Sequence, residues 1–235
     1  MTRMCGALVA VCLFTGAPLT HAEPSFAFVV EEDKTFGSTA GRLVFDADGV
    51  RFDSADGETA RMWTYENVKQ IQVLASTRFA IKTYEDQGRL KLGADRTFNY
   101  QVTDGTIPVE LVSFLLGRVE QPLVAAVVPA AIDTPPFAVP VKLRGRVKGS
   151  HGVLALHGDR LVYDAATDGA ARVWRPVDLH AVFQSDRHRL TIDAYEGGGD
   201  ATRTFSFELK RPLPTGFLDA MWDLVFAVEG AGATR

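Results

Sequence analysis

The sequence has almost no cysteine, no long apolar run and no excess of positive charge. Its only cysteines, Cys5 and Cys12, both fall within residues 1–22. Without those residues, the chain can form no disulfide, thiolate nucleophile or cysteine metal site. Beyond them, no apolar run reaches the roughly 18 residues typical of a membrane-spanning helix. A formal net charge of −4 and a pI near 5.7 argue against nucleic-acid binding.

Residues 1–22 have the pattern of a secretory signal peptide. Arg3 supplies a positive charge at the start, and residues 6–14 form a short apolar segment. Residues 20–22, Thr-His-Ala, place a small residue at each of the two positions that signal peptidase reads, which predicts cleavage before Glu23. We therefore expect an exported protein, periplasmic or extracellular, with no transmembrane segment in the mature chain. The alternative is an uncleaved anchor, and the shortness of the apolar segment argues against it.

An internal repeat is the strongest signal in the chain. At a spacing of 111 residues, residues 26–85 align with residues 137–196 without a gap, and fourteen of the sixty pairs are identical. The identical pairs include Trp63/Trp174. A period this long exceeds that of solenoid repeats and indicates a duplicated domain. The predicted division is a first repeat at 23–121, a Pro/Ala-rich linker at 122–136, a second repeat at 137–228 and a flexible tail at 229–235.

Each copy is predicted to contain strands first and one helix last. Apolar and polar residues alternate in short runs separated by Asp, Gly and Ser, which predicts about seven antiparallel strands per copy. The period then changes to 3.6 residues near 109–118 and again near 217–228, which predicts an amphipathic helix at the end of each copy. Because each copy has its own strands and helix, we expect each to fold alone.

A local pattern recurs in both copies. It consists of Gly-x-Leu, Asp-x-x-x-Phe/Tyr-Asp, an Arg-x-Trp strand, Asn67-Val68 or Asp178-Leu179 at the start of the next strand, and the final helix. This order resembles the pleckstrin-homology-like (PH-like) superfold in its GRAM or bacterial PH-like versions, and the resemblance covers nearly all of both copies. It implies a mostly β protein of two tandem PH-like domains. Each would hold about seven antiparallel strands in a bent sheet or partial barrel, capped by one C-terminal helix. A lipocalin-like barrel or another β-sandwich is the alternative.

No catalytic, metal or cofactor motif emerges from the residues. The histidines after residue 22 lack the i, i+4 spacing of a zinc site. The acidic run at 46–58 fails the EF-hand register, and the glycines at 197–199 lack the Lys-Ser/Thr of a phosphate loop. There is no Gly-x-Ser-x-Gly elbow. We therefore expect no catalytic residues, no metal and no cofactor.

The first predicted strand differs in charge between the copies. Copy one carries acids at 31–33, whereas copy two is basic from 142 to 148. Residues two apart on a strand share a face, so these cations would point the same way if the strand continues. The hairpin at 187–189 could lie on the same rim. The candidate ligand-binding residues are Lys142, Arg144, Arg146, Lys148, His151, Arg187 and Arg189. The alternative is a solvated edge that discourages strand pairing.

Known domains of the PH-like superfold are mostly non-catalytic and bind phosphoinositide headgroups, peptides or other proteins. The resemblance therefore implies a binding or interaction protein with a protein or peptide partner. One alternative is the binding of an anionic lipid or glycan by the basic face of copy two, where arginine offers bidentate geometry to phosphate. A second alternative is an enzyme of unrecognised class.

Overall fold

The structure is a computed structural model that describes residues 23–87, 94–129, 135–145, 148–197 and 201–232. It is mostly β, with two α-helices, as the sequence predicted. The signal peptide and Arg146 lie outside the described residues. The first half, which we name repeat 1, contains β1 (Phe26–Asp33), β2 (Ser38–Phe45), β3 (Val50–Ser54), β4 (Ala60–Trp63), the 3₁₀ turn η1 (Tyr65–Asn67), β5 (Val68–Ala75), β6 (Arg78–Asp86), β7 (Asp95–Val102) and α1 (Val109–Arg118).

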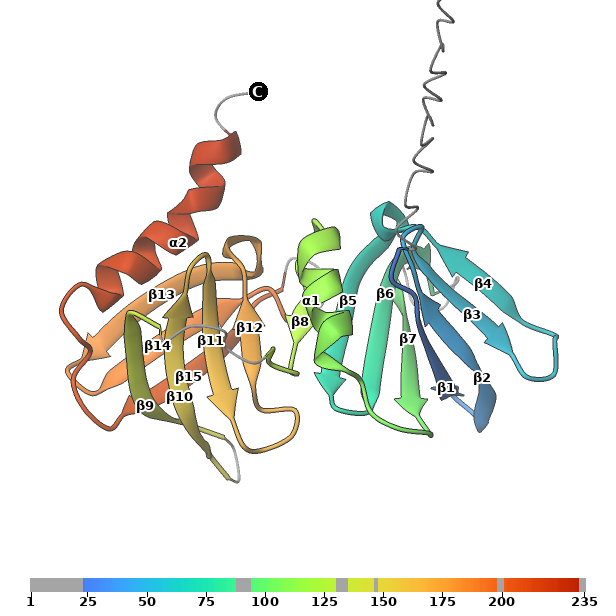
Figure 1. The fold of residues 1–235 in the computed structure, drawn as a ribbon, viewed down its shortest axis with the longest axis horizontal. Helices are drawn as coiled ribbons and strands as arrows, with labels where there is room; N and C mark the ends of the chain where they lie inside the picture. The colour runs from blue at the N-terminus through green and yellow to red at the C-terminus, as the bar shows by residue number, and fades with distance from the viewer. Residues whose placement is uncertain (1–22, 88–93, 130–134, 146–147, 198–200, 233–235) are drawn as a thin grey trace, which may run out of the picture.

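The second half, which we name repeat 2, has the same order of elements. It contains β9 (Phe137–Leu143), β10 (Ser150–His157), β11 (Arg160–Ala165), β12 (Arg172–Trp174), the 3₁₀ turn η3 (Pro176–Asp178), β13 (Leu179–Asp186), β14 (Arg189–Ala194), β15 (Arg203–Leu209) and α2 (Phe217–Gly232). Repeat 1 forms the right half of Figure 1 and repeat 2 the left half. Each half therefore has seven strands followed by one helix, as the periodicity predicted.

The pairing of the strands repeats as closely as the sequence does. The strand order is β5-β6-β7-β1-β2-β3-β4 in repeat 1 and β13-β14-β15-β9-β10-β11-β12 in repeat 2. Even the irregularities match. The β5–β6 register shifts between Val73 and Ala75, and the β13–β14 register shifts between Gln184 and Asp186, which is the same place 111 residues later. The duplication is therefore present in the backbone.

A fifteenth strand joins the two repeats. β8 (Val124–Ala125) pairs in parallel with β5 of repeat 1 and antiparallel with β12 of repeat 2. All the strands therefore form one open sheet that ends in β13 on one side and β4 on the other. The stretch predicted as a Pro/Ala-rich linker, residues 122–136, thus contains a short strand, and Leu123–Ala126 within it are between 0% and 4% exposed. Burial of these apolar side chains is more favourable in free energy than their exposure in a solvated linker would be.

Each repeat has its own hydrophobic core, and one core crosses the junction. In repeat 2 the core lies between the strands and α2, around Trp174, Phe205 and Phe217. The core of repeat 1 includes α1 and β8 and extends to Val162 and Val173 of repeat 2.

Two further features bear on the predictions. α2 continues to Gly232, four residues into the stretch predicted as a tail, since no proline stops it there and alanine favours the helix.

Among the described residues, no helix is both long and apolar enough to cross a membrane.

Candidate functional site

Three of the predicted residues, Lys142, His151 and Arg189, lie in a row that also contains acids. Lys142 on β9 is the register partner of His151 on β10 and of Glu208 on β15. Glu208 is in turn the partner of Arg189 on β14, which is opposite Asp186 on β13. Directly opposed residues point to the same face of a sheet. The fold therefore brings His151, Lys142 and Arg189 together, but it interleaves them with two carboxylates.

Those carboxylates neutralise part of the basic face. Glu208 lies 3.8 Å from the Lys142 ammonium and 3.5 Å from the Arg144 guanidinium, and Asp186 lies 3.8 Å from Arg189. All five side chains are between 41% and 54% exposed, so each pair is worth little energetically. Lys148 and Arg187 are exposed and form no ion pair within the described part of the chain.

A second charged cluster occurs in both repeats, and in repeat 2 it is sealed. Glu196 accepts hydrogen bonds from the Trp174 indole at 3.0 Å and from Arg172 Nε at 3.0 and 2.9 Å. The Arg172 and Glu196 side chains are only 3% and 2% exposed. A buried pair with these added hydrogen bonds holds β12 against the end of β14 and serves the scaffold.

In repeat 1 the same cluster is open. The Trp63 indole donates to Glu85 at 2.9 Å, but Arg61 turns away to Glu32, at 2.8 Å. Glu85 consequently stays 49% exposed, and its one cation partner among the described residues is Arg96 at 3.9 Å. The difference follows from one position, because repeat 2 has Leu143 where repeat 1 has Glu32.

Glu32 is incompletely satisfied in this arrangement. Its side chain is 4% exposed, and its Oε2 is buried without a hydrogen-bond partner among the described residues, as is the Tyr100 hydroxyl. Burial raises the pKa of Tyr100 well above its usual value, and the negative charge of Glu32 raises it further. A depression of about 1000 Å³ lies at this end of repeat 1, lined by Glu32, Asp33, Lys34, Thr35, Phe36, Arg61, Asp86, Gln87, Arg96, Thr97, Phe98 and Asn99. Its acids and bases are mixed, so the lining favours no single ligand charge.

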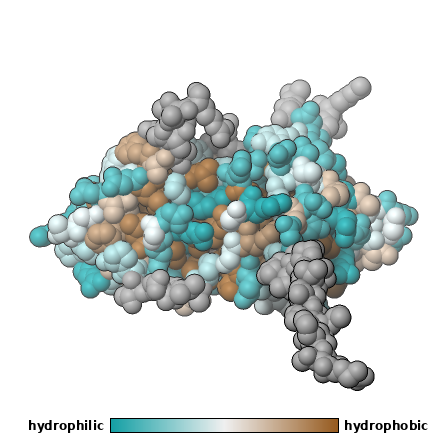
Figure 2. All heavy atoms as spheres, turned by 45° about the horizontal axis from the view of Figure 1, so that its top comes forward, coloured by the Kyte–Doolittle hydropathy of each residue, from teal (hydrophilic) through white to brown (hydrophobic). Residues whose placement is uncertain are grey.

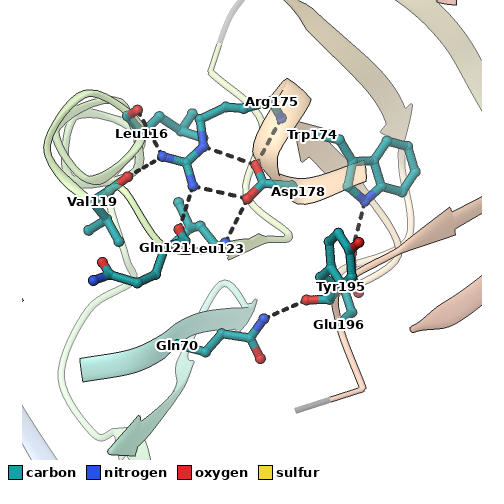
Figure 3. Close-up of polar contacts among 10 residues, drawn as sticks. All are labelled: Gln70, Leu116, Val119, Gln121, Leu123, Trp174, Arg175, Asp178, Tyr195 and Glu196. Atoms are coloured by element: carbon teal, nitrogen blue, oxygen red, sulfur yellow. Dashed lines mark hydrogen bonds and ion pairs between the residues drawn. The ribbon is translucent and has the colours of Figure 1, made fainter. Parts of the chain in front are cut away.

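One arginine and one aspartate form a buried cluster in the contact between the repeats. Arg175 donates from Nε and Nη2 to Asp178 at 3.0 and 2.9 Å (Figure 3). It also donates to the carbonyl oxygens of Leu116, Val119 and Gln121, where α1 ends.

Asp178 completes this clasp from the other side. Its carboxylate accepts the backbone N–H of Leu123 at 2.7 Å and that of Arg175 at 2.8 Å. A second link lies nearby, since Gln70 donates to the carbonyl of Tyr195 at 2.5 Å (Figure 3). The orphan carbonyls at the end of α1 thus find their donors in repeat 2.

The two helices differ in what covers them. In α1, Leu115 is fully buried, and the next residue, Leu116, is only 4% exposed, because α1 lies between the repeats (Figure 1). In α2, Met221 is fully buried, but the next residue, Trp222, is 40% exposed, and Phe226 one turn later is 46% exposed. Phe183 on β13, the strand against which α2 packs, is 43% exposed. Figure 2 shows hydrophobic surface gathered on the half of the molecule that contains repeat 2.

No protein-family model matches the chain, and no curated protein matches it. Among solved structures, the structure of the Spt16D Pob3N heterodimer is similar over 74% of this chain and 86% of that chain, at 9% sequence identity and a TM-score of 0.28. That likeness is too slight to support an argument about this chain.

The residues at the junction and on α2 were missed by the sequence reasoning. A signal for the junction exists in the aligned repeats, where Thr64 and Asn67 of copy one stand opposite Arg175 and Asp178 of copy two. No such signal exists for Trp222, because its 3.6-residue spacing with Leu218 and Val225 indicated a buried face. Among the described residues, no group of three or more His, Cys, Asp or Glu side chains is placed to hold a metal ion.

Proposed function

We propose that this chain is an exported, non-catalytic binding protein of two tandem PH-like domains, and that it binds its partner protein through repeat 2. The binding surface runs around the edge of the sheet: Trp222 and Phe226 lie on α2, and Phe183 lies on the edge strand β13, on the side opposite Val182 and the core. We name this surface the α2–β13 face. The observation that carries the proposal is the contrast between the helices. The strip of α1 that contains Leu116 is almost fully covered by the rest of the chain, whereas the strip of α2 that contains Trp222 and Phe226 stays 40% and 46% exposed at these residues.

The composition of the α2–β13 face supports a binding role. The Trp222 and Phe226 rings stack at 5.3 Å between centroids, and both are about half exposed. Clustered exposed aromatic side chains are characteristic of interaction sites, where tryptophan is enriched among the residues that dominate the binding energy.

The scaffold supports a binding module more than an enzyme. The order of seven strands and a helix in each repeat is the order of the PH-like superfold. Two charged pairs of repeat 2, Arg172–Glu196 and Arg175–Asp178, are buried, and in each pair the two side chains are hydrogen bonded to one another. They are therefore committed to the scaffold.

Site-specific photo-crosslinking in the native host tests the proposal. A benzophenone amino acid is placed at Phe183 or Phe226, and at Met62 or Tyr84 as controls, which are exposed hydrophobic residues of repeat 1 at 59% and 57%. We expect the same discrete crosslinked product from positions 183 and 226 and none from 62 and 84. Equal yields at all four positions would show that the α2–β13 face is ordinary surface.

Anion binding by the basic face of repeat 2 is a second proposal. The observation in its favour is that the fold does bring His151, Lys142 and Arg189 into one row, with Lys148 and Arg187 exposed. Because Glu208 opposes this charge, we expect weak binding to vesicles with anionic lipids, stronger in Glu208→Gln and weaker at high salt. Vesicle binding that Glu208→Gln leaves unchanged would contradict it.

A further inference from the structure

We infer that the solvent side of α2 binds a basic segment of a partner protein, whose arginine stacks on an exposed aromatic ring and pairs with the carboxylates beside it. This inference rests on the proposed function and specifies the chemistry of the partner. The residues that would make the contact are exposed, and we name them the acidic–aromatic patch: Asp219, Trp222, Asp223 and Phe226.

The acidic–aromatic patch is continuous along one side of α2. Residues three and four apart on a helix are neighbours on its surface, and positions 219, 222, 223 and 226 have these spacings. The Trp222 and Phe226 rings stack with 5.3 Å between their centroids. Met221 and Leu224 lie on the side of α2 that packs into the core of repeat 2, at 0% and 8% exposure. The acidic–aromatic patch therefore faces solvent rather than the core.

The two carboxylates of the patch have no internal partner. Neither Asp219 nor Asp223 forms an ion pair within the described part of the chain. Asp219 lies in the first turn of α2, where a negative charge interacts favourably with the helix dipole. Asp223 lies one turn further on, where that effect has fallen off. Asp223 is therefore free to contact a ligand.

The equivalent side of α1 has no acid. Each helix has two fully buried residues four positions apart, and these align Leu111 with Phe217 and Leu115 with Met221. In this alignment, Asp219 and Asp223 take the places of Ser113 and Gly117. The two carboxylates are therefore specific to the second copy, whose helix has the exposed aromatic rings.

The junction between the repeats shows how a helix of this kind is contacted by a cation. Arg175 of repeat 2 donates to the carbonyl oxygens of Leu116 and Val119 at the end of α1. α2 continues to Gly232, so the carbonyl groups near Trp222 are bonded within the helix. The acceptors that α2 offers to a cation at this point are therefore the carboxylates of the acidic–aromatic patch.

A carboxylate beside an aromatic ring suits a guanidinium group. The guanidinium is planar, so it stacks on the face of a ring and donates to a carboxylate in a fork. Repeat 2 already contains this combination, because the Arg172 guanidinium lies 5.5 Å from the centroid of the Phe205 ring and pairs with Glu196. An arginine of the partner would form the same contacts between two chains, while its apolar neighbours cover the remaining ring surface.

Two other occupants match the charge of the patch less well. A second copy that packs α2 against α2 would bring its own Asp219 and Asp223 against these carboxylates, and like charges in contact are unfavourable. A membrane surface with anionic lipids is negatively charged and would be repelled for the same reason. The occupant is therefore a basic segment of another protein.

Selection from a random peptide library tests the inference. The probe is a phage-displayed library of random peptides, selected on residues 23–235 after removal of binders to the double variant Trp222→Ser, Phe226→Ser. We expect the enriched peptides to contain arginine beside apolar or aromatic residues. The same selection on the double variant Asp219→Lys, Asp223→Lys should enrich acidic peptides instead. Cooperative urea unfolding shows that each variant is folded.

The affinity of one enriched peptide, made synthetically, separates the charges from the rings. Asp219→Asn combined with Asp223→Asn should weaken its binding about tenfold, and added salt should weaken binding to the unaltered chain. A peptide with citrulline in place of arginine should lose a similar factor, because citrulline is neutral. The matched control, Asp48→Asn combined with Asp104→Asn, removes the same charge from exposed positions of repeat 1 and should leave the affinity unchanged.

Three outcomes would overturn the inference: no enriched peptide, enrichment of acidic or uncharged peptides, or an affinity that the substitutions at 219 and 223 leave unchanged. Self-association of the chain that Trp222→Ser abolishes would also overturn it, because the patch would then belong to a second copy. If positions 183 and 226 crosslink to a partner and the substitutions at 219 and 223 do not alter the yield, the proposed function stands and only recognition of a cation fails.

Discussion

Single residues decide which of the two charged clusters is open. Arg61 and Arg172 occupy equivalent positions, yet Arg61 pairs with Glu32 and Arg172 pairs with Glu196. The glutamate at position 32 brings a buried carboxylate whose Oε2 has no partner. An unpaired buried acceptor costs about 1–3 kcal/mol, so the arrangement of the open cluster in repeat 1 lowers the free energy of unfolding.

The variant Glu32→Leu should therefore stabilise the chain. Leucine stands at the equivalent position of repeat 2, Leu143, and its presence at position 32 would free Arg61 to pair with Glu85 as Arg172 pairs with Glu196. We expect the free energy of unfolding to rise by about 1 kcal/mol, measured by urea denaturation. As a control, Leu143→Glu should lower it. If Glu32→Leu is destabilising, Glu32 is better satisfied than its contacts indicate.

The clasp between the repeats also depends on single residues. Asp178→Ala leaves the Arg175 guanidinium buried without its counter-charge and leaves the N–H of Leu123 without an acceptor. We expect a loss of about 3–5 kcal/mol in the free energy of unfolding, as for other broken buried pairs. Arg175→Met combined with Asp178→Ala should cost less than the sum of the two single variants, because no uncompensated charge remains. Additive losses would show that the two residues act independently.

At the scale of elements, the helices have the same origin but different environments. α1 is a structural element whose apolar strip is covered at the junction, whereas α2 leaves part of its apolar strip exposed. Leu116 and Trp222 each follow a fully buried residue of their helix, but they differ in exposure, at 4% and 40%.

Substitution of this pair should separate stability from binding. Leu116→Ala should lower the free energy of unfolding by about 2–5 kcal/mol, because it leaves a cavity at the junction. Trp222→Ala should lower it by less than Leu116→Ala does, since 40% of the Trp222 side chain is exposed. Thermal and urea denaturation measure both, and crosslinking from position 226 measures the effect of Trp222→Ala on the partner. A large loss of stability in Trp222→Ala would show that the α2–β13 face serves the core.

The strands and helices could be predicted from the sequence because alternation and 3.6-residue spacing report burial directly. Such patterns predict about seven strands and one final helix in each copy, and they also predict the matching positions of Trp63 and Trp174. β8 could not be predicted in this way. Its residues are apolar, but a two-residue strand has no period, and its proline-rich surroundings are typical of a connection.

At the scale of the whole molecule, the candidate site was predictable only in part. The basic residues were found because they lie within one stretch of sequence, but Glu208 and Asp186 reach them only through strand pairing. Trp222 is exposed because the junction between the repeats covers the apolar strip of α1 but does not cover that of α2. No local sequence pattern indicates this difference. The sequence therefore indicates the elements, whereas the contacts between repeats determine which surface is free.

The position of β8 makes a prediction about where the chain can be divided. The boundary expected from the sequence ends repeat 1 at residue 121 and removes β8 from it. Without β8, the edge of β5 is unpaired and Leu115 and Leu116 of α1 lose apolar neighbours. We therefore expect the fragment 23–129 to be more stable than the fragment 23–121, by several kcal/mol if Leu123–Ala126 rebury fully.

Urea denaturation of the two fragments measures this difference, and size-exclusion chromatography shows which of them self-associates. We expect 23–121 to associate through its bare strand edge and 23–129 to do so less, since β8 covers that edge. The variant 23–129 with Val124→Asp is the matched control, because it keeps the length of the longer fragment but places a charge in the buried strand. It should behave like 23–121. Equal stability of 23–121 and 23–129 would mean that β8 contributes to the junction only, and that repeat 1 is complete without it.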